Sequence, residues 1–157
     1  MQQHATITEA SFMHDANLKS ARRPRGRPIH SILVAFSVAY FAGALATDLA
    51  YWQMPDVMWE RFSIWLITVG LIMAGLATIA FMIDLAAHRR IDRPVWPRVV
   101  GYALAVLLAL TNAFVHSRDG YTAVVPTGLM LSGFVIVVLV LTALVARALT
   151  NSNRLGA

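Results

Sequence analysis

The sequence predicts an all-α integral membrane protein, a four-helix up-down-up-down transmembrane bundle with both termini in the cytoplasm. Three observations lead to this prediction. Of the 157 residues, 58% are hydrophobic and 13% are charged, with a mean hydropathy of +0.63, whereas a soluble domain carries about a quarter charged residues. The apolar residues form four unbroken blocks. Most basic residues stand beside those blocks, on one side of the expected membrane.

Each of the four blocks is long enough to cross the hydrocarbon core as a helix, which takes about 20 apolar residues. In chain order the blocks cover residues 29–52, 62–87, 97–116 and 123–148. The connections between them are short. Because short connections make consecutive helices antiparallel neighbours, the predicted topology alternates up and down.

The distribution of lysine and arginine predicts the orientation. Eleven of the 13 basic residues lie before block one, between blocks two and three or at the start of block three, or at and beyond the end of block four, and only Arg61 and Arg118 fall on the other side. Basic loops are retained in the cytoplasm. We therefore expect a multi-pass protein of the bacterial inner membrane, with residues 29–149 as its transmembrane domain and residues 150–157 as a short cytoplasmic tail.

The first 28 residues form a polar, basic cytoplasmic tail. Its basic cluster, Arg22, Arg23, Arg25 and Arg27, immediately precedes block one. We expect this cluster to face anionic lipid head groups or a partner protein. The same region also resembles a signal peptide with a cleavage site at residues 44–46. The apolar run continues to Trp52, however, which is longer than a signal core, so an uncleaved helix is favoured.

Small residues at four-residue spacing predict how the helices pack, because membrane helices associate by close backbone approach at such residues. Stripes occur in the first three blocks. They comprise Ala35, Ala39, Gly43 and Thr47, then Gly70, Ala74 and Ala77, then Gly101, Ala105, Ala109 and Ala113. The fourth block is bulkier beyond Gly128 and Ser132, so we expect it to show more surface to lipid or to a partner.

Ionisable residues inside membrane spans are rare and need a partner or a function. Asp48 lies about one turn from the outer end of block one, and Arg61 opens block two at the same boundary. We therefore expect a structural ion pair between Asp48 and Arg61. We expect His116 to be a solvated interface residue, and Asn112 to bond to a neighbouring helix.

His30 and His88 are expected at one depth on the cytoplasmic side. Asp84 and His88 are four residues apart and so share a helix face, and a carboxylate behind an imidazole is the pattern of a metal or haem ligand. Two histidines on different helices could hold a b-type haem in a bundle. The alternative is that both rings are ordinary interface residues without a cofactor. The spacing does not decide between the two, and the second is our leading interpretation.

The composition excludes several kinds of chemistry. Cysteine is absent, which removes disulfides, cysteine-ligated metal sites and thiol catalysis. Membrane orientation and anionic lipids explain the net charge of +5, so no nucleic-acid partner is expected. The sequence has no recognisable phosphate loop, broken-helix transport site or nucleophile with a base. We therefore expect neither an enzyme nor a metal site.

Residues 29–52, IHSILVAFSVAYFAGALATDLAYW, resemble the opening of an uncharacterised bacterial family of small four-helix inner-membrane proteins, a domain of unknown function. Its members typically open with His-Pro-x-Leu-Val-x-Phe-Pro and carry an aspartate later in the helix. His30 and Asp48 match the first and last of these features. Ser31 and Ser37 replace both prolines. The likeness continues to about residue 140, through Asp84 and other positions.

The resemblance implies a divergent member of that family with its four-helix membrane fold. Family members often carry a histidine early in helix three, where this chain has residues 98–101, and often end helix four with Gly-Trp-x-Gly-Gly, where this chain reads LTALVARAL. If the family holds a haem or metal through helix-one and helix-three histidines, this chain lacks one ligand.

These observations favour a non-catalytic accessory or structural subunit of a larger bacterial inner-membrane complex, or a homo-oligomer, surrounded by membrane lipids. One alternative is a b-type haem electron-transfer protein using His30 and His88, with Asp84 behind the ring. A further alternative is a lipid- or quinone-binding membrane protein.

Overall fold

The computed structural model describes residues 29–88, 96–118 and 124–155, and these residues are helical almost throughout, with no strand among them. The helices are α2 (Ile29–Gln53), α3 (Val57–His88), α4 (Trp96–Arg118) and α5 (Leu129–Leu155), and the short turn η3 (Val124–Gly128) precedes α5. Each of the four long helices is long and apolar enough to cross a membrane. This confirms the predicted all-α fold with four helices that could span a membrane, while the cytoplasmic position of the termini stays a prediction. The basic cluster at Arg22, Arg23, Arg25 and Arg27 lies outside the described residues.

α3 begins at Val57, five residues before the start that hydropathy predicts. Its first five residues include Glu60 and Arg61, which interrupt the apolar pattern. Asp56 caps the helix, because its Oδ1 accepts a hydrogen bond from the backbone N–H of Met58 at 3.0 Å. A carboxylate at this position satisfies a free N–H of the first turn, so a polar turn still begins the helix.

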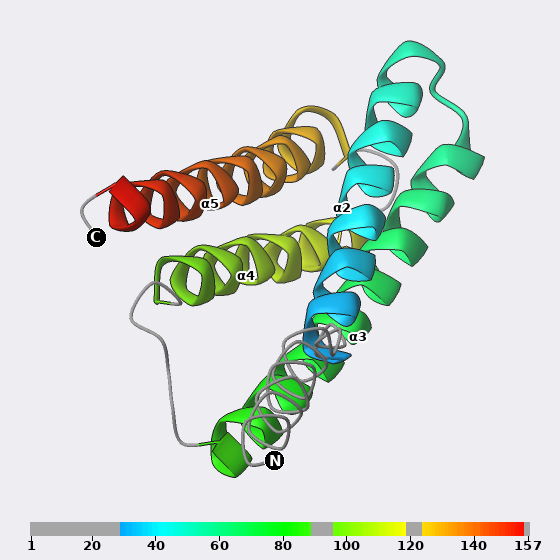
Figure 1. Ribbon diagram of the computed structural model, residues 1–157. Coiled ribbons are helices and arrows are strands. Elements are labelled where there is room, and N and C mark those ends of the chain that lie inside the picture. Colours follow the sequence, from blue (N-terminus) through cyan, green and yellow to red (C-terminus); the bar gives the residue numbers. More distant parts are fainter. Residues whose placement is uncertain (1–28, 89–95, 119–123, 156–157) are drawn as a thin grey trace, which may run out of the picture.

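The helices form two antiparallel hairpins, α2–α3 and α4–α5, and the second hairpin lies obliquely across the first (Figure 1). α2 and α3 pack along much of their length, whereas α5 packs mainly on α4 and to a lesser extent on α2. We call the end at which each hairpin is connected, after α2 and after α4, the connection end. The opposite end, which holds the start of α2 and the end of α5, is the terminal end.

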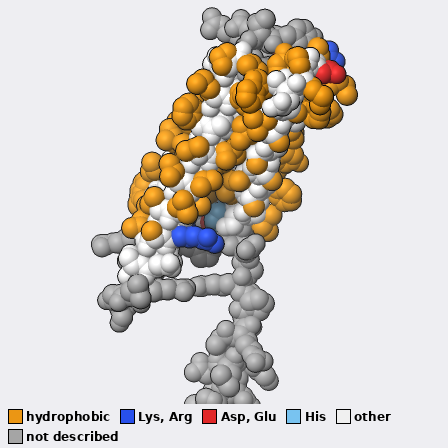
Figure 2. Space-filling model, turned by 90° about the horizontal axis from the view of Figure 1, so that it is seen from above, with side chains coloured by type: hydrophobic (Ala, Val, Ile, Leu, Met, Phe, Trp, Pro, Cys, Tyr) orange, Lys and Arg blue, Asp and Glu red, His pale blue; other side chains and the backbone are white. Residues whose placement is uncertain are grey.

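Each helix buries one face, marked by residues three or four apart. α2 buries Ser37, Phe41, Ala44 and Asp48, and the central apolar layer joins Phe41 to Ala105, Ala109 and Val135. Most large hydrophobic side chains point outward instead, and they cover the face shown in Figure 2. That pattern suits a lipid environment, in which apolar side chains lose nothing by exposure.

Glycine allows two close approaches between helices. A Cβ at Gly70 would lie 2.7 Å from a ring atom of Phe41, and a Cβ at Gly101 would overlap the side chain of Thr142. The stripes predicted in α3 and α4 therefore lie at helix contacts, with Ala74, Ala77, Ala105 and Ala109 buried.

The stripe predicted in α2 was wrong at its start. Ala35 and Ala39 are exposed and line an open groove of about 610 Å³ together with Ser31, Ile32 and Phe36. The buried face of α2 is rotated from this stripe by about 160°, because it follows Ser37 and Phe41, two residues on from Ala35 and Ala39. The buried face combines the small residues Ser37 and Ala44 with the larger Phe41 and Asp48.

Candidate functional site: a buried polar cluster

Four polar side chains from three helices meet near the connection end. Asp48 comes from α2, Asn112 and His116 from α4, and Ser132 from α5, and we call these four residues the polar cluster. Asp48 is fully buried, and Asn112 and His116 are 1% and 5% exposed. In α4 the two polar residues stand one turn apart, on the same face as Ala105 and Ala109. The buried face of α4 is thus apolar in its middle and polar towards the connection end.

Hydrogen bonds join the cluster. Ser132 Oγ donates to Asp48 Oδ2 at 2.5 Å, and Asn112 Nδ2 donates to Ser132 Oγ at 2.8 Å. The two nitrogens of the His116 ring point to different partners. Nδ1 lies 3.0 Å from the backbone oxygen of Asn112, and Nε2 lies 3.4 Å from Asp48 Oδ1.

α3 adds two buried polar residues at the same level. Phe41 of α2 packs on Gly70 of α3. Asp48 follows Phe41 by seven residues and Ser63 precedes Gly70 by seven, which is about two turns along each antiparallel helix. Ser63 therefore lies at the level of Asp48. Glu60, one turn before Ser63, is 9% exposed and interacts electrostatically with His116.

Two polar atoms at this level, Ser63 Oγ and Asn112 Oδ1, are buried and have no hydrogen-bond partner among the described residues. Leaving such an atom unpaired costs about 1–3 kcal/mol. At this level of the bundle, the Ser63 hydroxyl could therefore donate a hydrogen bond to a small polar molecule such as water, and Asn112 Oδ1 could accept one.

The end of the turn η3, just before α5, closes over the imidazole. A Cβ at Gly128 would lie 2.7 Å from Cε1 of His116. Val125, three residues earlier, has extended backbone angles (φ −122°, ψ 124°) that interrupt the helix. Glycine at residue 128 is needed here because any side chain would displace the ring.

The expected Asp48–Arg61 ion pair was wrong. Asp48 contacts His116 and Ser132 instead, and Arg61 lies on the exposed side of α3. The reason is the helical rotation of about 100° per residue: because Glu60 turns toward the bundle, Arg61 turns away from it. The expectation that His116 is solvated was also wrong, since its side chain is fully buried. The expected bond from Asn112 to a neighbouring helix is confirmed.

A second histidine–aspartate pair lies near the terminal end. His30 Nδ1 of α2 is 2.7 Å from Asp84 Oδ2 of α3, and both side chains are partly exposed. Phe81 packs edge-on against the His30 ring. The sequence predicted Asp84 behind His88, on its own helix, whereas the structure shows Asp84 bonded to His30 across the hairpin. The side chain of His88 lies outside the described residues.

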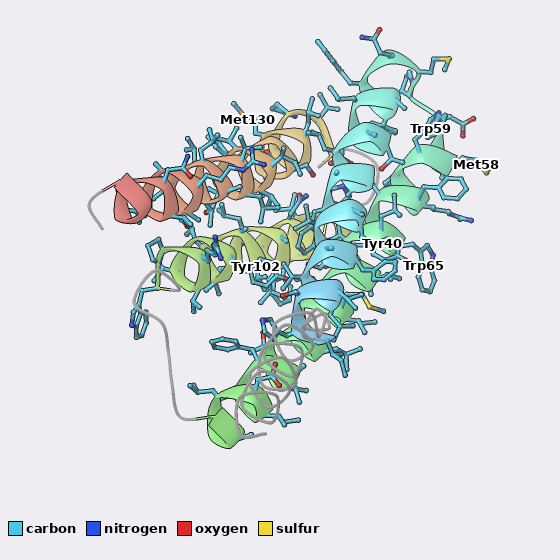
Figure 3. All side chains as sticks on the ribbon, viewed as in Figure 1. Tyr40, Met58, Trp59, Trp65, Tyr102 and Met130 are labelled. Carbon is cyan, nitrogen blue, oxygen red and sulfur yellow. The ribbon has the colours of Figure 1, made fainter. Side chains whose placement is uncertain are left out.

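The two pairs are separated along the bundle. His30 and Asp48 are 18 residues apart on α2, which corresponds to about 27 Å of helix. Between them lies a hydrogen bond between the hydroxyls of Ser37 and Tyr102, for which Tyr102 reaches from α4 to α2 (Figure 3). The apolar layer of Phe41, Ala105, Ala109 and Val135 follows. Among the described residues, no group of three His, Cys, Asp or Glu side chains could hold a metal ion.

A comparison with protein families matches residues 26–156 to the model described as "Predicted membrane protein (DUF2231)". The chain belongs to this family. No curated protein and no solved structure matches it. The match confirms the family resemblance seen in the sequence, and the matched part of this DUF2231 protein contains both histidine–aspartate pairs.

Sequence reasoning missed the polar cluster of the DUF2231 chain, although one signal was present. Residues 105, 109, 112 and 116 follow one another by four, three and four positions, which places Asn112 and His116 on the face that carries the alanine stripe. A polar pair on a packing face points inward, and this could have identified His116 as buried.

Proposed function

We propose that this protein is a non-catalytic membrane subunit, accessory or structural within a larger bacterial inner-membrane assembly, with both chain ends in the cytoplasm. One observation carries the proposal: the apolar layer of Phe41, Ala105, Ala109 and Val135 packs between the polar contacts at the two ends. A carrier needs a site that opens alternately to each side, and this layer separates the two ends of the bundle.

The surface supports a role in assembly. α5 sits at the edge of the bundle and exposes a long row of large apolar side chains. In the proposed role part of this row contacts a partner helix and the rest contacts lipid. The eleven basic residues beside the spans favour the inner membrane and cytoplasmic ends.

Photo-cross-linking in native membranes tests the proposal. A photoreactive residue would replace Val137 of α5, which is 52% exposed, and in a matched chain Ile72 of α3, which is 54% exposed. We expect a protein adduct from Val137 and mainly lipid adducts from Ile72. Lipid adducts alone at both positions, or a lone monomer in mild detergent, would contradict the proposal. If Val137 formed adducts only with a second copy of this chain, the proposed larger assembly would be wrong and the protein would be a homo-oligomer.

A b-type haem electron-transfer role is the second candidate, favoured by the His30–Asp84 contact. A carboxylate on Nδ1 fixes an imidazole so that its Nε2 can coordinate iron, and His88 follows Asp84 by one turn. Haem-replete expression and a visible spectrum test this role. A Soret band lost in His30→Ala but kept in His116→Ala would support it, and no band in the unmodified protein would exclude it.

Lipid or quinone binding is the third candidate, favoured by the groove on α2. The groove of about 610 Å³ has Ser31 as its polar residue beside Ile32, Ala35, Phe36 and Ala39. A mostly apolar cavity with one polar group suits an amphipathic molecule. Mass spectrometry of purified protein would show a stoichiometric molecule that is lost in Ala35→Trp, and no bound molecule would contradict this role.

A further inference from the structure

The hydrogen bonds of the polar cluster determine where its protons lie. A backbone carbonyl can only accept, so His116 Nδ1, at 3.0 Å from the Asn112 oxygen, carries a hydrogen. Asn112 Nδ2 can only donate, so Ser132 Oγ accepts from it. The single hydrogen of Ser132 is then donated to Asp48 Oδ2. These roles follow from the partners of each atom.

The remaining contact is between His116 Nε2 and Asp48 Oδ1, at 3.4 Å. With Nδ1 protonated, a neutral His116 has a bare lone pair on Nε2. An ionised Asp48 has only lone pairs on Oδ1. Two hydrogen-bond acceptors would then face each other between side chains that are fully buried. Their lone pairs would repel each other. One additional proton removes the conflict, on either atom.

We propose that the polar cluster is a binding site for one exchangeable proton, held between His116 Nε2 and Asp48 Oδ1. With this proton the pair is neutral overall, either as imidazolium with carboxylate or as imidazole with carboxylic acid. Without it the pair carries one negative charge in a buried site, which is costly in a membrane. The inference stands on the contacts of these residues and does not depend on the assembly role proposed above.

The groups facing the site come from every helix packed around it. α2 supplies Asp48, and α3 supplies Glu60, whose carboxylate acts electrostatically on His116. η3 and α5 supply Gly128 and Ser132, which do not titrate. On α4 the next charged residue is Arg118, whose side chain lies outside the described residues.

The proton exchanges with the connection end. Glu60 lies in the first turn of α3, at the connection end, and is 9% exposed, so this residue reaches the surface there. The proton leaves Nε2 or Oδ1, passes to Glu60 or a nearby water, and then enters solvent. Exchange with the terminal end is blocked by the apolar layer around Phe41. The site therefore responds to the pH of one compartment.

Ring-nitrogen NMR of the full chain with isotope-labelled histidine, in lipid bilayers, tests the proposal at about pH 8, where an isolated histidine is neutral. His116→Asn assigns the signals. We expect either a doubly protonated His116 ring, or a neutral ring protonated on Nδ1 together with a carboxylic-acid infrared band that Asp48→Asn removes. A neutral ring without that band would overturn the proposal. Asp84→Asn, which alters the other pair, should leave the His116 signals unchanged.

Two milder variants keep the test decisive if Asp48→Asn fails to fold. Glu60→Gln removes a neighbouring negative charge and should lower the pH at which the proton is lost, by about one pH unit. Ser132→Ala removes a donor that stabilises the carboxylate and should raise that pH by a similar amount. Arg61→Gln, one residue from Glu60 but exposed, serves as the control. An unchanged titration in both Glu60→Gln and Ser132→Ala would contradict the proposal.

Discussion

Asp48 and His116 show how a membrane domain accommodates an aspartate. A carboxylate buried between helices needs a partner, and Asp48 has the imidazole of His116 and the hydroxyl of Ser132. The threonines of the spans behave differently. Thr68, Thr78 and Thr142 each donate to the carbonyl four residues earlier in their own helix. Their hydroxyls are satisfied locally, so only a few polar residues join separate helices.

Removing one member of the buried pair should be costly. Asp48→Ala leaves His116 and Ser132 without their buried hydrogen-bond partner, and we expect it to lower the free energy of unfolding by roughly 3 kcal/mol. Arg61→Gln changes an exposed side chain and should stay within about 0.5 kcal/mol of the unmodified protein. Detergent unfolding followed by tryptophan fluorescence measures both. An equal loss of unfolding free energy in the two variants would instead support the Asp48–Arg61 ion pair that the sequence suggested.

At the scale of elements, glycine determines how closely the helices approach. Gly70 lets α2 and α3 meet at Phe41, and Gly101 lets α4 and α5 meet at Thr142. Close approach increases dispersion contacts, which are a main source of helix association in lipid. Gly75 is different, because a Cβ there would meet no atom within 4 Å.

A pair of glycine substitutions tests this distinction. Gly70→Ala should destabilise the protein by about 1–3 kcal/mol, because the new methyl group overlaps the Phe41 ring and pushes α2 and α3 apart. Gly75→Ala should be neutral or stabilise by up to about 1 kcal/mol, because alanine is the better helix former. Both are measured by the same unfolding titration. A loss in Gly75→Ala as large as in Gly70→Ala would show that contact with Phe41 is not the cause.

At the scale of the whole molecule, the two hairpins enclose an interior that is polar towards both ends and apolar in the middle. The polar cluster and the His30–Asp84 pair are separated by the layer around Phe41. The two ends of the bundle are therefore chemically distinct. The distribution of basic residues predicts which compartment each end faces.

The absence of cysteine makes that orientation simple to measure. A single cysteine at Met54, exposed after α2, or at Ser152, exposed near the end of α5, would be labelled in intact cells with a membrane-impermeant thiol reagent. We expect labelling at residue 54 before lysis and at residue 152 only after it. The reverse pattern would place the chain ends outside the cytoplasm and overturn the predicted topology.

Hydropathy and charge were sufficient to predict the helices, but not their rotation. The apolar blocks predict α2 to α5 because crossing the hydrocarbon requires length and apolarity, both of which are local properties. The site depends on which face of each helix turns inward. Every face of α2 is apolar enough for lipid, so its pattern could not show that Ser37 and Phe41 are buried and Ala35 and Ala39 exposed.

The sequence by itself determined that this chain belongs to the DUF2231 family and that four of its described helices are long and apolar enough to cross a membrane, because span length and family likeness are local properties of the sequence. The tertiary structure alone decided that Asp48 meets His116 and Ser132, and that Asp84 meets His30. These partners are 68, 84 and 54 residues apart. Contacts at such separations depend on how the two hairpins cross. In a membrane protein the lipid-facing and the buried faces of a helix are both apolar, so the apolar pattern does not specify that crossing.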